Sequence, residues 1–304
     1  MKTRKKRLIK ALHNWQLYLM MAPALLYTIL FVYKPMYGVQ IAFREYNFAD
    51  GITGSPWVGF DNFERLFVSY WFPIILKNTL TLSLLSLAIT FPLPIIFALM
   101  VNELQNEKVK RTIQTVSYAP HFISTVVMCG MLILFLSPTS GIINTFIKLL
   151  GGEAIAFMSK PAMFKWVYVL SGVWQQLGWN SIIYCAALSG VDKSLLEAAE
   201  IDGASRLQRI WYINLPVLVP TIVVQLILRC GQLLSVGYEK TLLLQNNVNL
   251  NASEVISTYV YKVGLQQYNY SFSTAANLFN SLCNIIMLVT VNTITKKLTK
   301  ESLW

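Results

Sequence analysis

Charged residues are scarce in this chain of 304 amino acids, where Asp, Glu, Lys and Arg together make up only 13%. In soluble domains about a quarter of the residues are charged, whereas this chain is 55% hydrophobic and has a mean hydropathy of +0.51. Its composition therefore excludes an ordinary soluble domain. It predicts a protein that crosses a membrane several times.

Cysteine and histidine are also rare. The four cysteines lie inside apolar stretches, far apart in sequence and without a nearby histidine, and the two histidines are His13 and His121. Neither a zinc site nor a disulfide framework fits this pattern, so we expect no bound metal. The cysteines are interpreted as small buried hydrophobic residues: Cys129, Cys185, Cys230 and Cys283.

Two missing motifs bear on the energy source. The chain has no Gly-x-x-x-x-Gly-Lys-Ser/Thr loop, so it is not expected to bind ATP through a P-loop. Its apolar segments contain no pair of carboxylates suited to relaying protons, which argues against a proton-driven carrier. A transporter built from this chain would have to receive its energy from another subunit, and we expect no cofactor and no catalysis on the chain itself.

Six apolar segments approach or exceed the roughly 20 residues that a bilayer requires. The first is interpreted as a retained helix and not a signal peptide, because it contains Pro23 and runs into Lys34-Pro35 instead of a cleavage site. Pro92 and Pro94 are expected to bend the second segment, and Pro120 lies near the start of the third. The predicted spans are 15–33, 74–101, 116–136, 166–188, 217–236 and 273–294.

Basic residues predict the orientation of these six spans. Fifteen Lys and Arg residues fall on the side of the N-terminus, the loop around Lys108, the central loop and the tail, and eight fall on the opposite side. Because cytoplasmic loops carry the excess of basic residues, both termini and the central loop are predicted to face the cytoplasm. The net charge of +11 is thus explained by orientation, and no nucleic-acid partner is expected. The longer external loops, 139–165 and 238–272, either contact an extracellular partner or are solvated connectors.

Three of the predicted spans carry polar residues at helical spacing. Polar groups inside a bilayer need a partner helix or a wet cavity, so these stripes either line a translocation path or hold neighbouring helices together. Aromatic side chains that could stack on a substrate lie nearby at Trp174, Trp179 and Tyr184. The stripes are Gln176 and Asn180; Gln225, Arg229 and Gln232; and Asn277, Asn280 and Asn284.

Arg229 differs from the amides because it is charged. A charge in the middle of a span costs about 2.5 kcal/mol or more and usually faces a cavity or a counter-charge. No acidic residue lies within the six predicted spans, which leaves a phosphate, a carboxylate on a partner subunit, or snorkelling to an interface. We favour a role in a cavity or at a partner subunit.

The central loop, 191–216, carries the most specific pattern in the chain. Glu197, Ala198 and Ala199 are good helix formers, whereas Asp202 and Gly203 interrupt the helix, and Asp202 could cap a second one. Leu215 and Pro216 then open the fifth span. The pattern predicts a helix, a turn, a second helix and then the membrane.

The order Glu-Ala-Ala, three residues, Gly, nine residues, Ile, one residue, Leu-Pro resembles the signature loop of permease subunits of bacterial ABC importers. Every fixed position of that loop is filled here. Further stretches resemble the oligosaccharide and polysaccharide branch of these permeases, so the resemblance covers nearly the whole chain. These stretches are 15–20, 33–43, 57–63, 118–124 and 184–190.

The resemblance implies an importer with two permease subunits, usually different, two ATPase domains that hold ATP and Mg²⁺, and an extracellular solute-binding lipoprotein. Glu197 and Ala198 would dock into a cleft of the ATPase, Gly203 would permit the bend, and 213–216 would anchor the loop to the fifth span. The expected coupling residues are Glu197, Ala198, Ala199, Asp202, Gly203, Ile213, Leu215 and Pro216.

The expected organisation is a basic cytoplasmic N-terminus (1–14), a six-span permease domain in the bacterial cytoplasmic membrane (15–294, with a cytoplasmic coupling helix between spans four and five) and a basic cytoplasmic tail (295–304). Two other functions remain open at this point. One is an ion-driven carrier or channel that works without an ATPase, which would need ion ligands in broken helices. The other is a membrane scaffold that only assembles other subunits.

Overall fold

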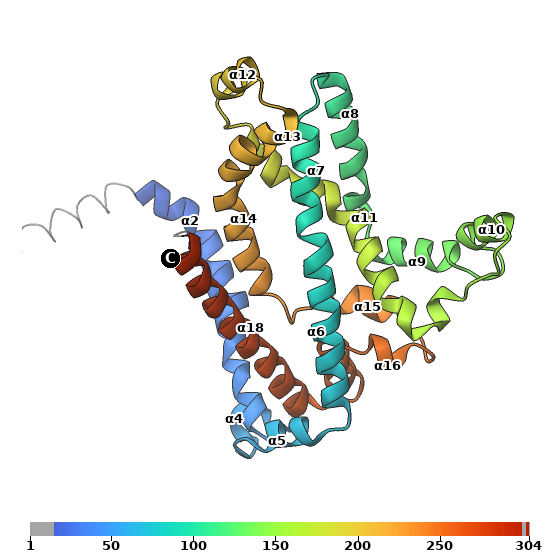
Figure 1. Ribbon diagram of the computed structural model, residues 1–304. Helices are drawn as coiled ribbons and strands as arrows, with labels where there is room; N and C mark the ends of the chain where they lie inside the picture. Colours follow the sequence, from blue (N-terminus) through green and yellow to red (C-terminus); the bar gives the residue numbers. More distant parts are fainter. Residues whose placement is uncertain (1–14, 300–301, 304) are drawn as a thin grey trace, which may run out of the picture.

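The computed structural model describes residues 15–299, 302 and 303 (Figure 1). Among these residues the regular elements are all helices, and the only β-type pairing is an isolated bridge between Arg44 and Trp57. The predicted all-α class is therefore confirmed. The basic segment 1–14 and residues 300, 301 and 304 of the predicted tail lie outside the described residues.

Four of the described helices are long and apolar enough to cross a membrane, or five if one bent pair counts as a single span. This supports a protein that crosses the membrane several times, but it does not reach the six spans that the sequence predicts. The four helical segments are Trp15–Phe43, Trp71–Asn102, Arg206–Cys230 and Tyr270–Thr299.

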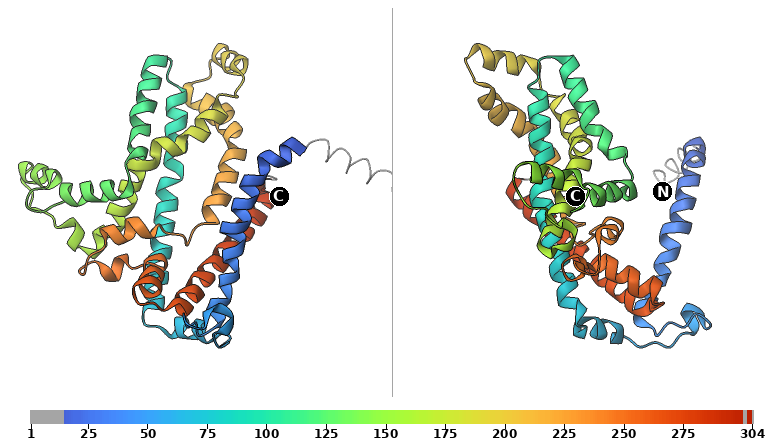
Figure 2. Two further views of the ribbon diagram at one scale, coloured as in Figure 1. Left: turned by 180° about the vertical axis from the view of Figure 1, so that it is seen from behind. Right: turned by 90° about the vertical axis from the view of Figure 1, so that its right-hand side faces the viewer.

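The first segment contacts the rest of the chain mainly through its last turns. It consists of α2 (Trp15–Thr28), η1 (Ile29–Tyr33), α3 (Lys34–Met36) and η2 (Tyr37–Phe43). No residue of α2 is buried, and α2 stands away from the other helices in the right-hand view of Figure 2, whereas η2 packs against α18 (Tyr270–Thr299). An apolar helix with no side chain buried against the described residues is left to face lipid or another subunit.

The second segment joins α6 (Trp71–Thr90) to α7 (Pro92–Asn102). Phe91 between them keeps helical dihedral angles, φ −82° and ψ −50°, and its N–H still donates to the Leu87 carbonyl over 3.2 Å. Pro92 therefore occupies the first position of a new helical stretch, where its missing N–H costs little. The two stretches together form one apolar helix of 32 residues.

The predicted third span is not one continuous helix. It is divided between α8 (Glu107–Tyr118) with η3 (Ala119–Phe122) and α9 (Thr125–Phe135), which meet at 97°. Pro120 cannot donate a backbone hydrogen bond, and the Ser124 hydroxyl accepts from the Val127 N–H over 3.3 Å and so starts a new helix. The break at Pro120 was not predicted, and the membrane crossing expected for 116–136 stays a prediction.

The predicted fourth span lies inside α11 (Pro161–Leu188), a helix of 28 residues that is not among the four long apolar ones. A side chain of α11 stabilises the break between α8 and α9. Gln175 donates over 2.8 Å to the Ile123 carbonyl, which the break leaves without a helical donor. Gly178 lets α11 pass close to α8, since a Cβ there would lie 2.2 Å from the Ser117 carbonyl oxygen. Polar residues lower the mean hydropathy of α11, and one of them, Gln175, stabilises the neighbouring segment.

The predicted fifth span ends earlier than expected. The helical segment, α13 (Arg206–Arg209), η5 (Ile210–Asn214) and α14 (Leu215–Cys230), stops at Cys230 instead of reaching residue 236. The chain between α14 and α18 contains short helices that are tied together by Glu254, which is 3% exposed and accepts from Lys262 and Gln245. The remaining short elements are α4 (Gly51–Gly54), α5 (Asp61–Val68), α10 (Ile142–Leu149), η4 (Phe157–Ser159), α15 (Tyr238–Leu244), α16 (Leu250–Ser253), α17 (Ile256–Tyr261) and η6 (Lys262–Gln266).

The long helices place the loops at two opposite ends of the molecule. The helix α12 (Lys193–Ile201), α13 and the start of α8 lie at one end, and α4 and α5 lie at the other (Figure 1). One buried core joins α6, α9, α11 and the short helices, and a second joins α7, α11 and α14. Because α11 takes part in both cores, it holds the two groups of helices in place.

Candidate functional sites: an exposed helical loop and two polar hollows

The loop 191–216 folds as a helix, a turn and a second helix. The first helix, α12, begins at Asp192, whose carboxylate accepts from the Ser194 N–H over 2.9 Å. This backbone hydrogen bond holds the pKa of Asp192 below its ordinary value, because it favours the charged form. The N-terminus of the helix is thus capped by a side chain of the loop itself.

The turn differs from the sequence-based expectation in one detail. Gly203 has φ +79°, the left-handed conformation that ends a helix, and Asp202 closes α12 instead of opening the next helix. Ser205 is the residue that caps α13, through reciprocal hydrogen bonds with Gln208. The prediction of Asp202 as an N-cap was wrong, and the Ser-x-x-Gln spacing could have identified Ser205.

The loop presents apolar side chains to its surroundings. No residue of α12 is buried, Glu197 and Ala198 are exposed, and Ala199 is half-buried. Ile201 is 86% exposed and Leu207 is 77% exposed. Large apolar side chains this exposed at the end of a molecule are available to contact a partner.

A cluster of polar side chains, which the sequence reasoning missed, fixes this loop to the bundle. Arg209 lies 3.1 Å from Glu200 on α12 and 3.9 Å from Glu103, which follows α7. The buried Asn214 also donates to Glu103 over 3.2 Å. No sequence motif connects residues 103 and 209, because they are distant in the chain.

The anchoring residues at the start of α14 have different environments. Leu215 packs against the second core, Ile213 is half-buried and Pro216 is exposed. Pro216 lies within a continuous helix, and the π-helical turn of η5 just before it accommodates the missing donor. The loop therefore passes into the long helix without a flexible joint.

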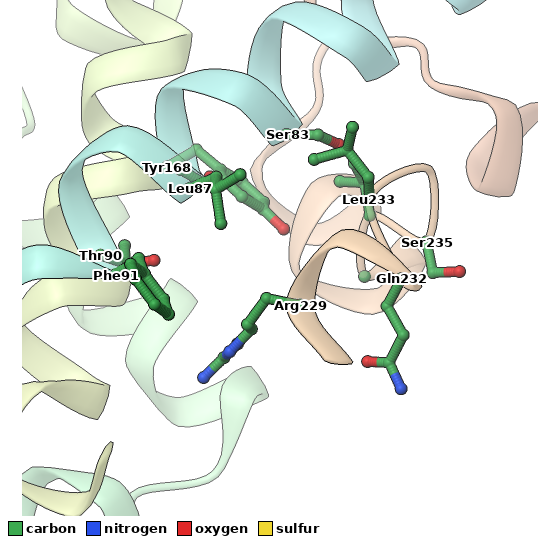
Figure 3. Close-up of a pocket in the computed structure, with 12 residues that line it drawn as sticks. Ser83, Leu87, Thr90, Phe91, Tyr168, Arg229, Gln232, Leu233 and Ser235 are labelled. Carbon is green, nitrogen blue, oxygen red and sulfur yellow. The ribbon is translucent and has the colours of Figure 1, made fainter. Parts of the chain in front are cut away.

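Two polar hollows lie between the long helices, and Arg229 lines both. The first has a volume of about 210 Å³, and Figure 3 shows Arg229 extending from α14 into the space that faces Thr90 and Phe91. Its lining residues are Ser83, Ser86, Leu87, Thr90, Phe91, Tyr168, Arg229, Gln232, Leu233, Ser235, Val236 and Gly237. The second has about 200 Å³ and is lined by Thr90, Phe91, Pro94, Trp179, Asn180, Ile183, Tyr184, Gln225 and Arg229.

The structure brings four of the eight predicted path residues to these hollows: Asn180, Gln225, Arg229 and Gln232. Gln232 does so from the turn after α14 and not from the helix itself, because α14 ends at Cys230. Of the predicted stacking residues, Trp179 and Tyr184 line the second hollow, and Trp174 lines neither.

The other four predicted path residues lie elsewhere. Gln176 bonds the ring of His121 over 2.9 Å, and Asn284 accepts from the Leu234 N–H over 3.0 Å and donates to Ser235 over 2.9 Å. Asn280 is buried, Asn277 is exposed, and neither lines a hollow. The stripes therefore do not all converge, and Gln176 and Asn284 connect neighbouring segments.

The hydroxyl groups of the first hollow were also missed. Ser83, Ser86 and Thr90 follow a helical spacing along one face of α6, and Tyr168 reaches the same space from α11 (Figure 3). Small hydroxyl residues in an apolar helix carry a weak signal on their own, because they often bond their own backbone. Their spacing of three and four residues is the feature that could have revealed them.

Long apolar helices with polar hollows between them define an all-α membrane protein of the kind that forms transport subunits. The chain belongs to the family described as binding-protein-dependent transport system inner membrane component, whose family model matches residues 90–300. It is a multi-pass protein of the bacterial cytoplasmic membrane. The resemblance drawn from the central loop is confirmed.

Relatives agree over almost the full length. The chain is 42% identical over 301 residues to the polygalacturonan/rhamnogalacturonan transport system permease protein YteP of Bacillus subtilis (strain 168), covering 99% of this chain and 94% of the relative. It is also 42% identical over 288 residues to Protein LplB of the same strain, covering 95% and 91%. A chain in the crystal structure of a bacterial ABC transporter that imports the acidic polysaccharide alginate matches with a TM-score of 0.89 and 40% identity, over 96% of this chain and 99% of that one.

Proposed function

We propose that this chain is a permease subunit of an ATP-driven importer that moves an oligosaccharide or polysaccharide fragment from an extracellular binding protein into the cytoplasm. The observation that carries the proposal is the pairing of an exposed, self-capped helix at one end of the molecule with two polar hollows between the long helices. The relatives named for polygalacturonan and alginate transport support a fragment of an acidic polysaccharide as substrate.

The proposed assembly contains this chain, a second homologous permease subunit, two ATP-binding subunits with ATP and Mg²⁺, an extracellular solute-binding lipoprotein and surrounding lipid. The chain itself does no chemistry and binds no nucleic acid. Both termini face the cytoplasm and the chain crosses the membrane six times, with the bent pair of α8 and α9 and the helix α11 as the third and fourth crossings. The charge distribution and the length of α11, 28 residues, support this arrangement.

The loop 191–216 is proposed to bind the ATPase and to transmit its conformational change to the long helices. Glu197 and Ala198 lie on an exposed helix that can enter a cleft, and Ile201 and Leu207 supply apolar contact area. Arg209 joins α12 to the end of α7. A shift of α12 therefore moves the long helix of α6 and α7, in which Phe91 lines both hollows and Pro94 lines the second. The mechanism is rigid-body transmission through packed helices.

Purification of the chain from its native membrane, together with the proteins that accompany it, tests this function. We expect an ATPase and a second permease in the complex, and ATP-dependent uptake of oligosaccharide after reconstitution with the binding protein. Glu197→Ala and Gly203→Pro should weaken coupling and leave sugar capture by the binding protein intact. Recovery of neither an ATPase nor a second permease, or uptake driven by an ion gradient without ATP, would overturn the proposal.

A further inference from the structure

Arg229 carries a charge without a counter-charge in the described chain. It takes part in none of the ion pairs formed by the described residues, and neither hollow is lined by an Asp or a Glu. Arg229 is exposed, and Figure 3 shows its guanidinium projecting into the space between α6 and α14. A cation on the wall of a cavity within a membrane protein attracts an anion far more strongly than it would in water.

The surroundings of Arg229 suit a polyhydroxylated ligand. The Ser83 side chain lines the first hollow, Ser83 is only 7% exposed, and its hydroxyl oxygen has no hydrogen-bond partner. Buried polar atoms are nearly always paired, so an unpaired hydroxyl at a hollow is completed by a ligand or a water molecule. Tyr168 and Gln232 add further donors and acceptors to the same wall.

The two hollows share one wall. Thr90, Phe91 and Arg229 belong to both, so a ligand that extends from one to the other passes the guanidinium. Each hollow, at about 210 and 200 Å³, is smaller than the roughly 300–1,000 Å³ that holds a drug-sized molecule. Each therefore suits a single sugar ring. Such a ring can stack on Phe91 or on the face of Trp179 opposite the one that stacks on His121.

We propose that Arg229 selects the transported sugar by its charge: it binds the carboxylate of a uronic acid unit while neighbouring units occupy the two hollows. The planar guanidinium matches a carboxylate with two parallel hydrogen bonds, which neutral hydroxyl groups cannot reproduce. This inference rests on the proposed import function, and it assigns the choice between acidic and neutral oligosaccharides to one residue of this chain. The competing role, in which Arg229 pairs with a carboxylate of the second permease, is an outcome of the test.

The test uses the complete importer, reconstituted in proteoliposomes with its binding protein. The probes are trigalacturonate and its methyl ester, which has the same length and no charge. Arg229→Gln should lower uptake of trigalacturonate by about tenfold or more and change uptake of the ester less than about twofold, because only the charge-assisted pair is lost. Arg229→Lys should retain part of the uptake, since it keeps the charge and loses the paired geometry.

Direct binding of both probes to the detergent-solubilised complex, without the binding protein, removes any selection that the binding protein makes. The control is Lys148→Gln, which deletes an exposed positive charge on α10, outside both hollows, and should leave the ratio of the two probes unchanged. Equal losses for both probes in Arg229→Gln, as expected if Arg229 pairs with the second permease, would overturn the inference, and so would no loss for either. If both probes are taken up equally in an ATP-dependent manner, only this inference is refuted. If no oligosaccharide is taken up in an ATP-dependent manner, the proposed function is refuted.

Discussion

The guanidinium of Arg209 lies 3.9 Å from the carboxylate of Glu103, so a residue of the exposed loop contacts the end of the long helix formed by α6 and α7. The same guanidinium lies 3.1 Å from Glu200 on α12. The side chains of Arg209 and Glu103 are only 12% and 18% exposed, so this contact is better shielded than a surface ion pair, which is worth about 0–1 kcal/mol. Arg209, on α13, thus connects α12 directly to the helix that lines both hollows.

Arg209→Gln is therefore expected to uncouple ATP hydrolysis from transport. Loss of the ion pairs leaves α12 free to move without α7, so stimulation of the ATPase by the loaded binding protein should fall severalfold while basal hydrolysis persists. Arg111→Gln is the matched control, because Arg111 is an exposed cation on α8 at the same end of the molecule. Unchanged stimulation in Arg209→Gln would show that the contact does not transmit motion.

At position 203, the substitution Gly203→Asn is expected to preserve the turn and Gly203→Val to disrupt it. An added Cβ has no neighbour within 4 Å, so only the backbone angle of φ +79° opposes a side chain. The left-handed conformation costs a residue with a Cβ about 1–2 kcal/mol, and Asn adopts it more readily than most residues. Co-purification of the ATPase should fall in Gly203→Val and stay close to normal in Gly203→Asn. Equal retention in both would mean that the turn is not needed for docking.

Asn284→Ala should destabilise the subunit instead of altering its selectivity. The substitution leaves the buried Leu234 N–H without an acceptor, which costs about 1–3 kcal/mol. Asn277→Ala, on the same helix but exposed, should have little effect on thermal unfolding of the purified complex. A change in sugar preference for Asn284→Ala without a loss of stability would show that Asn284 lines the transport path after all.

Lys240 predicts a dependence of stability on alkaline pH. Burial lowers its pKa from 10.5 to about 8, because desolvation disfavours the charged amine, which donates to the Tyr168 carbonyl over 2.7 Å. The unfolded chain binds this proton more tightly than the folded chain, so the contribution of Lys240 to the free energy of unfolding should rise as pH increases from about 8 to 10.5, by up to about 3 kcal/mol. Thermal unfolding at several pH values measures this contribution as the difference between the protein and Lys240→Met. That difference should grow over this range, whereas the difference from Lys148→Met should stay constant.

The sequence predicts the long apolar helices and the central loop well because both depend on local chemistry. Hydropathy locates a helix, and the Gly203 turn follows from a residue type that adopts positive φ readily. The break after Pro120 was missed because it depends on α11, whose Gln175 satisfies a backbone carbonyl that would otherwise be unpaired in a membrane. Composition within one segment cannot reveal a partner in another.

The predicted path shows the same limit. Arg229 was found because an isolated charge in an apolar segment needs a cavity or a partner, whatever the fold. Helical spacing placed the amides on common faces but could not tell which face meets a cavity, so Asn180 and Gln225 line a hollow while Asn284 bonds a turn. The contact between Glu103 and Arg209 could not be predicted from the sequence, since it depends on how α7 and α13 are arranged in space.

The right-angled break between α8 and α9 has a consequence for how the chain is made. Its free Ile123 carbonyl is satisfied by Gln175, and its His121 ring is held by Gln176, both on a helix that the ribosome synthesises later. Both contacts can therefore form only after α11 has been synthesised. The final shape of 107–135 depends on a segment that follows it in the order of synthesis.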